Sequence, residues 1–188
     1  MNTNQTDRRV RKTKALLLKG LMQLMETKDI RDISVKELSD LVDINRSTFY
    51  LHYSDIYDML AQIENELFIE FNDILDRTIC QSFEPSSAQT TLLEIFFFLD
   101  RHRDVTRTIM GPHGDLSFVN RMKDLVKERI HHHLNSNHPH SDYIYIEPFV
   151  VSGCIGVIET WLNHPDPKTP EEMAIMCNTL LTKGSFLL

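Results

Sequence analysis

The chain has 188 residues, which is long enough for one large or two small domains with a buried core. Its first residues are polar and then basic, which argues against a signal peptide, and no uninterrupted apolar run approaches the roughly 18 residues of a membrane span. Cys80, Cys154 and Cys177 are odd in number and lack metal-type spacing, so we expect reduced thiols in a cytoplasmic protein.

The net charge of −7 is distributed unevenly along the chain. Residues 1–53 contain ten lysines and arginines against seven acidic residues, a net charge of +3. Residues 54–188 contain ten against twenty, a net charge of −10. A basic head on an acidic body favours a protein that presents one end to the phosphates of a nucleic acid.

Helical periodicity runs through almost every segment, and no run alternates as a strand does. A first helix is expected from Arg8 to Thr27, and a second begins after Ser34, which forms a capping-box pattern with Glu37. A turn follows at Asp43, and the side chain of Asn45 is suited to cap a third helix.

Residues 34–53 therefore predict two short helices joined by a tight turn. The second of these helices opens on small polar and basic side chains with aromatic residues behind them, as a helix that enters a DNA major groove requires. A basic run from Arg8 to Lys14 lies on the helix just before this motif. The pattern predicts a DNA-binding head.

A long amphipathic helix is predicted from Asp55 to Cys80, and Glu84–Ser87 is predicted to be a loop. The segment Thr91–Arg101 is apolar nearly all round, so we expect a buried helix whose run Phe96–Phe98 belongs to the core rather than to a ligand site. Glycine and proline at residues 111–114 mark the next break.

The next amphipathic helix, around Phe118 to Ile130, ends in a polar tract with five histidines between His131 and His140. Imidazoles bind Zn²⁺ or Ni²⁺ well, so a metal-responsive regulator is one alternative. Consecutive helical residues point about 100° apart, however, and cannot all face one ion. We interpret the tract as a solvated helix end and expect neither a metal nor a cofactor.

The last two predicted helices contain the candidate subunit contacts. One covers Phe149 to Asn163, and an earlier start would place a kink at Pro148. Its glycines cost roughly 1 kcal/mol each unless another helix approaches closely. The last helix begins at Thr169–Pro170 with a capping box. The candidate interface residues are Gly153, Gly156, Val157, Trp161, Met173, Met176, Cys177 and Leu180.

The run Thr48-Phe49-Tyr50-Leu51-His52-Tyr53 resembles the T-[LF]-Y-x-[HY]-[FY] signature of the TetR family of bacterial regulators, and the resemblance covers about residues 8–67. The segment Gly153–Leu162 is similar to C-terminal domains of several regulators, including the dihydroxyacetone-kinase regulator type. Asp43 stands where the family usually has glycine, and aspartate tolerates the left-handed conformation that the turn needs.

The resemblance implies an all-α fold of about nine helices. It implies a three-helix helix-turn-helix DNA-binding head, residues 1–53 continuing into the start of the fourth helix, and a ligand-binding and dimerisation bundle, residues 54–188. It further implies a cytoplasmic homodimer, a repressor in the family's usual mode, that binds a palindromic double-stranded DNA operator. An unidentified small ligand would control release of the DNA, and no membrane is involved.

The resemblance also implies roles for single residues. Basic groups of the first helix would contact phosphates, the start of the third helix would face base edges, and the residues behind it would reach phosphates or the groove wall. Phe49 and Tyr53 would pack inward, and Ile56 stands where the family often has a phosphate-binding lysine. The candidate DNA contacts are Arg8, Arg9, Arg11, Lys12, Ser34, Asn45, Arg46, Ser47, Thr48, Tyr50 and His52.

Two further interpretations remain beside the regulator. An enzyme is disfavoured because no nucleophile motif or glycine-rich phosphate loop is present. A helical dimeric adaptor that has lost DNA binding is favoured only by Ile56. The basic cluster Arg101, His102, Arg103 and Arg107 could serve an anionic ligand, although a solvated helix end is the simpler interpretation.

Overall fold

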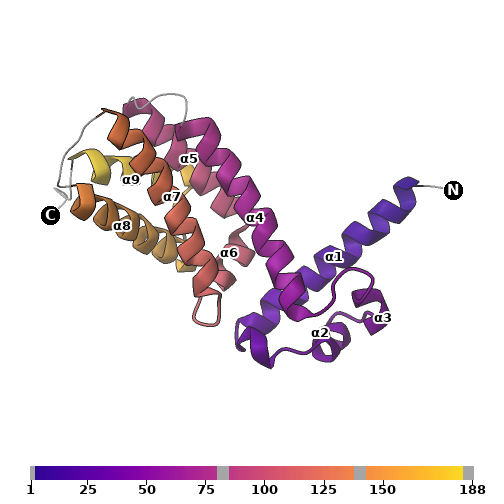
Figure 1. The fold of residues 1–188 in the computed structure, drawn as a ribbon. Helices are drawn as coiled ribbons and strands as arrows, with labels where there is room; N and C mark the ends of the chain where they lie inside the picture. Colours follow the sequence, from indigo (N-terminus) through magenta and orange to yellow (C-terminus); the bar gives the residue numbers. More distant parts are fainter. Residues whose placement is uncertain (1–2, 80–84, 138–142, 184–188) are drawn as a thin grey trace. The chain divides into compact units, whose positions relative to one another are not determined.

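The computed structural model describes residues 3–79, 85–137 and 143–183, and these residues form nine α-helices and one 3-10 helix without a strand (Figure 1). The prediction of an all-α protein is confirmed. The chain divides into two compact units. The head unit comprises Met1–Asn65 and Thr108–Asp115, and the body unit comprises Glu66–Arg107 and Leu116–Leu188.

The head unit is built from three helices, a 3-10 turn and the start of a fourth helix. These elements are α1 (Thr3–Met25), η1 (Ile30–Asp32), α2 (Val35–Leu41), α3 (Arg46–Phe49) and α4 (Ile56–Ile79). Apolar residues at helical spacing on α1, including Leu17, Leu21 and Met25, are buried against the inner residues of the other elements, such as Leu38 and Phe49. These residues of α1 therefore form part of the core of the head.

A glycine permits close packing of α1 on α2. A Cβ atom placed at Gly20 would lie 2.4 Å from Cγ1 of Val42 and 2.9 Å from Cδ1 of Leu38. Both distances are shorter than van der Waals contact, so any larger residue would push the two helices apart. This packing sets the position of α2 and, through the short turn that follows, the start of α3.

The turn between α2 and α3 adopts the backbone conformation that the sequence predicts. Asp43 has a positive φ of 53°, the left-handed region that aspartate tolerates better than most residues. The amide of Ile44 donates to the carbonyl of Ser39 at 3.0 Å, which closes the turn. The four residues Val42–Asn45 thus suffice to connect the two helices.

The body unit contains the rest of α4 and five more helices, of which α6 has its last two residues in the head unit. These helices are α5 (Pro85–Arg101), α6 (Arg103–Ile109), α7 (Leu116–Asn137), α8 (Tyr143–Asn163) and α9 (Pro170–Lys183). The loop expected at Glu84–Ser87 is wrong from Pro85 onward, because proline is well suited to the first position of a helix, where its missing N–H has no partner to lose. The short helix α6 had not been predicted.

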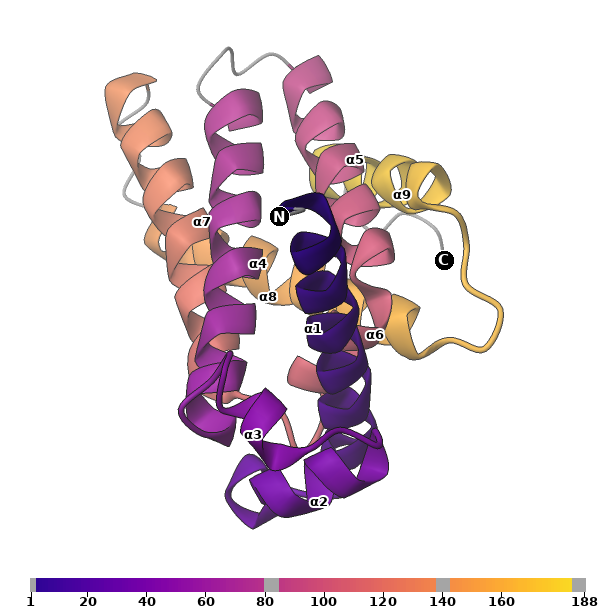
Figure 2. The same ribbon diagram turned by 90° about the vertical axis from the view of Figure 1, so that its right-hand side faces the viewer.

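Aromatic side chains form the centre of the body unit. The rings of Phe71 and Phe98 lie 5.7 Å apart, and Phe96 meets Trp161 edge to face at 5.2 Å. Phe96 and Phe98 are each 1% exposed, whereas Phe97 between them is 38% exposed. The prediction that this run belongs mainly to the core is confirmed. The helices α4, α5 and α7 run alongside one another in this unit (Figure 2).

Helix α9 begins with a complete capping box. The amide of Thr169 donates to Oε2 of Glu172 at 2.9 Å, and the amide of Glu172 donates to Oγ1 of Thr169 at 3.3 Å.

Helix α8 contains Pro148 and is apolar almost throughout. By length and composition alone, the segment Ile144–Asn163 could cross a bilayer, although it contains two glutamates.

Candidate nucleic-acid interface

The start of α3 is organised by the side chain of Asn45. Its Oδ1 accepts hydrogen bonds from both the amide and the hydroxyl of Ser47, each at 2.9 Å. Arg46 and Ser47 are exposed and Thr48 is half-buried. The N-cap prediction is confirmed, and the cap leaves the small polar side chains at the helix start facing outward, as a helix that reads base edges requires.

The aromatic residues behind this helix start divide into a buried and an exposed set. Phe49 and Tyr53 are 0% and 6% exposed, with ring centroids 5.6 Å apart, whereas Tyr50 is 58% exposed and His52 is half-buried. The ammonium of Lys14 lies 5.4 Å from the centroid of the Tyr53 ring, a cation–π contact that joins α1 to this segment. The predicted inward packing of Phe49 and Tyr53 is therefore confirmed.

The basic residues of α1 form an exposed strip. Arg8, Arg11 and Lys12 are three and four residues apart, so their side chains emerge on one side of the helix, and Arg9 lies beside them. All four are exposed, and none forms an ion pair with another part of the chain that the structure describes. Their charges are free to meet phosphates.

Ser34 acts as the N-cap of α2. Its Oγ accepts a hydrogen bond from the amide of Glu37 at 3.1 Å. The carboxylate of Glu37 contacts the ammonium of Lys28 instead of returning to the cap, so only half of the predicted capping box forms. The side chain of Ser34 is exposed, and its hydroxyl proton remains available to a phosphate.

The start of α4 differs from a phosphate-binding helix end. Ile56 is 3% exposed and packs in the head. Oδ2 of Asp58 accepts from the amide of Ser54, and Oδ1 of Asp55 accepts from the amide of Asp58, both at 2.8 Å. The hydrogen bond from Ser54 holds the pKa of Asp58 below its usual value. Two carboxylates thus occupy the amides that an anion would need.

Three of the four basic groups that could have served an anionic ligand are bound within the body unit. Arg101 and His102 both contact the carboxylate of Glu70. The guanidinium of Arg103 donates to the carbonyl of Trp161 and lies over its ring. These contacts leave the cluster poorly placed to bind an added anion. Arg101 is exposed, as expected of a solvated helix end, whereas His102 and Arg103 are half-buried.

A second exposed surface lies on α8. A Cβ atom added at Gly153 or at Gly156 would meet no atom of another element within 4 Å, so none of the helices that the structure describes covers these glycines. Tyr145 and Phe149 are 73% and 80% exposed and lie about two helical turns and one helical turn before Gly153, respectively. These two aromatic residues were not among the predicted interface residues. The signal available in the sequence was that positions 145, 149 and 153 follow one another at intervals of four, which places them on one face of a helix.

The remaining residues of the predicted interface differ in their exposure. Trp161, Met173 and Cys177 are 3%, 4% and 3% exposed, because they pack inside the subunit. Val157, Met176 and Leu180 are half-buried. Trp161, Met173 and Cys177 therefore lie in the interior of the subunit, beneath the exposed surface of α8.

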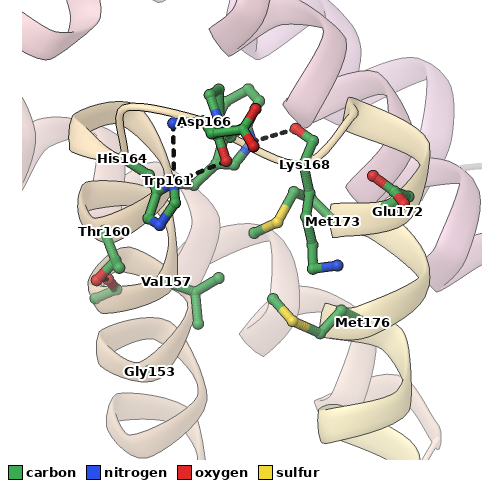
Figure 3. A pocket seen from close by; sticks show the side chains of 12 residues that line it. Gly153, Val157, Thr160, Trp161, His164, Asp166, Lys168, Glu172, Met173 and Met176 are labelled. Carbon is green, nitrogen blue, oxygen red and sulfur yellow. Dashed lines mark hydrogen bonds between the residues drawn. The ribbon is translucent and has the colours of Figure 1, made fainter.

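An open groove of about 790 Å³ runs between α8 and α9 (Figure 3). Val157, Trp161 and Met176 give it an apolar lining, and polar residues from the connection between the helices lie at one end. The indole Nε1 of Trp161 donates to the carbonyl of Lys168 at 2.7 Å, which fixes that connection. The groove is continuous with the exposed surface of α8 that contains Gly153 and Gly156, because both glycines also line the groove.

The histidine tract lies mostly outside the described residues. His131 is exposed on α7, whereas the side chains of residues 132–137 and all of His138 and His140 fall outside the described part of the chain. Among the residues that the structure describes, no group of three histidine, cysteine or acidic side chains is placed to hold a metal ion. The metal-responsive alternative remains a prediction, and Cys80 also lies outside the described residues.

Comparisons with known proteins agree with this architecture. Residues 86–183 match the TetR_C_8 family, described as a transcriptional regulator C-terminal region. No curated protein sequence matches significantly. A TetR transcriptional regulator from Streptococcus agalactiae is structurally similar, with a TM-score of 0.60, 20% identity, and coverage of 96% of this chain and 99% of that one.

Two further solved structures are similar in fold. A TetR-family member from Streptomyces coelicolor has a TM-score of 0.68 at 14% identity, over 89% of this chain and 90% of that one. The regulator FadR from Bacillus subtilis, solved in complex with stearoyl-CoA, has a TM-score of 0.64 at 13% identity, over 90% and 98% of the two chains. The dihydroxyacetone-kinase regulator subgroup is not confirmed by the match to residues 86–183.

Proposed function

Because this chain belongs to the TetR family of transcriptional regulators, we propose that it represses transcription by binding a palindromic operator as a homodimer in the cytoplasm, and that a small ligand releases it. The observation that carries the proposal is the outer face of α3, where a capped helix start presents Arg46 and Ser47 beside the exposed ring of Tyr50.

The exposed charges of the head support this proposal. Residues 1–53 have a net charge of +3, and the strip Arg8–Lys12 is exposed on α1. Lysine and arginine contacts to phosphates supply affinity without sequence preference, while α3 supplies the base contacts. The acidic body, with a net charge of −10 over residues 54–188, opposes binding of DNA anywhere else.

Dimerisation follows from the shortness of the reading element. Helix α3 spans only Arg46–Phe49, so one copy reads few bases. Two copies whose recognition helices are about 34–36 Å apart read both halves of a palindrome. The uncovered apolar face of α8 supports a symmetric contact, since large exposed apolar surfaces on soluble proteins commonly mark interaction sites.

The exposed stripe of α8 is complementary to itself. Tyr145 and Phe149 provide bulky side chains, and Gly153 and Gly156, further along the same stripe, provide depressions. In a two-fold interface each surface meets a copy of itself. If two α8 helices cross antiparallel near Val151, Phe149 of each copy lies over Gly153 of the other. This arrangement accounts for glycines that would otherwise only weaken the helix.

The ligand part of the proposal is supported by the regulator from Bacillus subtilis, whose structure contains stearoyl-CoA. A ligand controls DNA binding only if it binds one conformation of the dimer more tightly than the other. A body conformation that spaces the two heads incorrectly for the operator would meet this requirement.

Binding to DNA from the region upstream of the chain's own gene tests the proposal. Wild-type protein is expected to shift this DNA in a salt-dependent manner, and Thr48→Ala or Tyr50→Ala is expected to weaken the shift while the protein stays dimeric on sedimentation. Leu116→Ala, an exposed substitution on α7, is the control and should bind normally. Unchanged binding by both α3 variants would instead favour the adaptor that has lost DNA recognition.

A further inference from the structure

Leu51 is the most exposed large apolar side chain in the described part of the head, at 79%. It directly follows Tyr50, the C-cap of α3, and helical hydrogen bonding continues past it, with the amides of His52 and Tyr53 donating to the carbonyl of Phe49 at 2.9 and 3.1 Å. The backbone around Leu51 is therefore held in place, and the exposure is not that of a loose loop.

The position of Leu51 relates it to the polar residues at the start of α3. Leu51 follows Ser47 by four residues, so the two side chains emerge on the same side of the helical path, one turn apart. Ser47 and Tyr50 are exposed there as well. Phe49 and Tyr53, on the opposite side, are buried. Leu51 thus belongs to the face that carries the proposed base contacts.

An apolar side chain has one specific partner among the base edges of a major groove. Most groups that the bases present there donate or accept hydrogen bonds, whereas thymine presents a bulky apolar group, its C5-methyl. We infer that Leu51 is a specificity-determining residue that packs against a thymine methyl in each half of the operator. This inference rests on the proposed binding of operator DNA by α3.

Ordinary surface exposure predicts a different behaviour. Single exposed leucines are common on soluble proteins and need no partner. Leu116 on α7 is such a residue, 74% exposed and part of the body unit, and so provides a control of nearly equal exposure. If Leu51 has the same character, its removal changes DNA binding no more than Leu116→Ala does.

Removal of the methyl group from the DNA tests the contact directly. An operator is selected from randomised duplex DNA with wild-type protein, and each thymine is then replaced by deoxyuridine in both symmetric halves. At one thymine position we expect wild-type affinity to fall about 15-fold, or about four-fold for each methyl group that is no longer buried. At fixed salt concentration, fluorescence anisotropy gives these affinities.

The same series with Leu51→Ala completes the experiment. The variant should bind the thymine operator about 15-fold more weakly than wild type and should lose nothing more on deoxyuridine replacement at that position. Leu116→Ala should retain the full wild-type sensitivity. Equal sensitivity of wild type and Leu51→Ala at every thymine would overturn the inference while leaving operator binding intact. Failure of wild type to select any sequence would overturn the proposed function as well.

Discussion

Nδ1 of His113 lies 2.7 Å from Oδ1 of Asp29, although 84 positions separate the two residues in the sequence. Asp29 follows α1, and His113 lies in the segment Thr108–Asp115, which joins α6 to α7 and belongs to the head unit. The imidazole N–H donates to the carboxylate, and this hydrogen bond lowers the pKa of Asp29 more than any other contact, with Arg31 contributing further. The contact therefore joins two segments of the head unit that lie far apart in the sequence.

This contact predicts a pH-dependent contribution to stability. A carboxyl group whose pKa is lower in the folded state than its ordinary value of 3.8 stabilises the fold above that pH, and the contribution is lost as the pH falls through the folded pKa. We expect His113→Ala to lower the free energy of unfolding at pH 7, and the difference from wild type to shrink below about pH 4. Urea denaturation followed by circular dichroism measures both quantities.

A matched control for this contact is Asp40→Asn, which changes an exposed aspartate on α2. It should change the free energy of unfolding little at either pH. If His113→Ala remained equally destabilising in acid, the hydrogen bond to ionised Asp29 would not be the cause of the effect.

The basic strip on α1 predicts a specific change in salt dependence. The logarithm of the binding constant falls linearly with the logarithm of salt concentration, with a slope of about −0.9 for each phosphate neutralised. Arg11→Ala removes two contacts from a dimer, so we expect the slope to become less steep by about 1.8. Selectivity between operator and unrelated DNA should stay the same. Lys123→Ala on α7 should leave the slope unchanged, and an unchanged slope for Arg11→Ala would remove α1 from the interface.

The open space at Gly153 predicts that a small substitution leaves the fold intact and that a large one weakens the dimer. Gly153→Ala adds a methyl group where the subunit has room, so the fold should tolerate it. Gly153→Arg places a large charged side chain in the proposed two-fold contact, where overpacking costs about 1–3 kcal/mol per site and occurs twice. Sedimentation should show a dimer dissociation constant raised at least about 30-fold.

Asn120→Arg provides the control for charge, because Asn120 is exposed on α7. That variant should remain as dimeric as wild type. A Gly153→Arg protein that is also fully dimeric would place the subunit interface elsewhere on the molecule.

Arg103 is expected to anchor the end of α8. Its guanidinium carbon lies 4.0 Å from the centroid of the Trp161 ring, and Nη1 donates to the carbonyls of Trp161 and Leu162 at 3.3 and 3.5 Å. Lysine cannot reproduce this planar stacking and forked donation. We expect Arg103→Lys to reduce the free energy of unfolding by about 1–2 kcal/mol.

Trp161 is the single tryptophan of the chain, so its fluorescence during urea unfolding reports directly on this contact. Arg101→Ala, which removes an exposed ion pair with Glu70, is the comparison and should cost no more than about 1 kcal/mol. Similar losses for the two variants would mean that the stacking on Trp161 contributes little.

The two described cysteines should be unreactive in the folded protein. Burial, together with the neighbouring Cys154 thiol, raises the pKa of Cys177 to about 12, and burial also raises the pKa of Cys154. Since the thiolate is the reactive form, a Cys80→Ser protein should react with a disulfide reagent at pH 8 far more slowly when folded than in denaturant. The stability that depends on neutral Cys177 should be complete below about pH 9 and be lost as the pH rises toward 12. Rapid reaction of the native protein would contradict the burial.

Much of the fold could be predicted because its signals are local. The caps at Asn45 and Thr169 use hydrogen bonds to residues two and three positions away, and the left-handed turn at Asp43 depends on that residue's own backbone. Helical periodicity likewise repeats within a few residues. Interactions of this range are encoded by neighbouring side chains, so the helices of the head and the start of α9 could be derived without knowledge of the rest of the chain.

The sequence by itself thus determined the helices, their caps and the polar start of α3. The tertiary structure decided which side chains are buried and which distant groups meet. It places Ile56 in the core, ties His113 to Asp29, and buries Trp161 while leaving Phe149 exposed on the same helix. Burial depends on which elements pack together over long sequence separations, and periodicity identifies an apolar face without identifying what covers it. For this reason the sequence indicated an apolar helix at α8, and only the packed subunit revealed the face of α8 that the described residues leave uncovered.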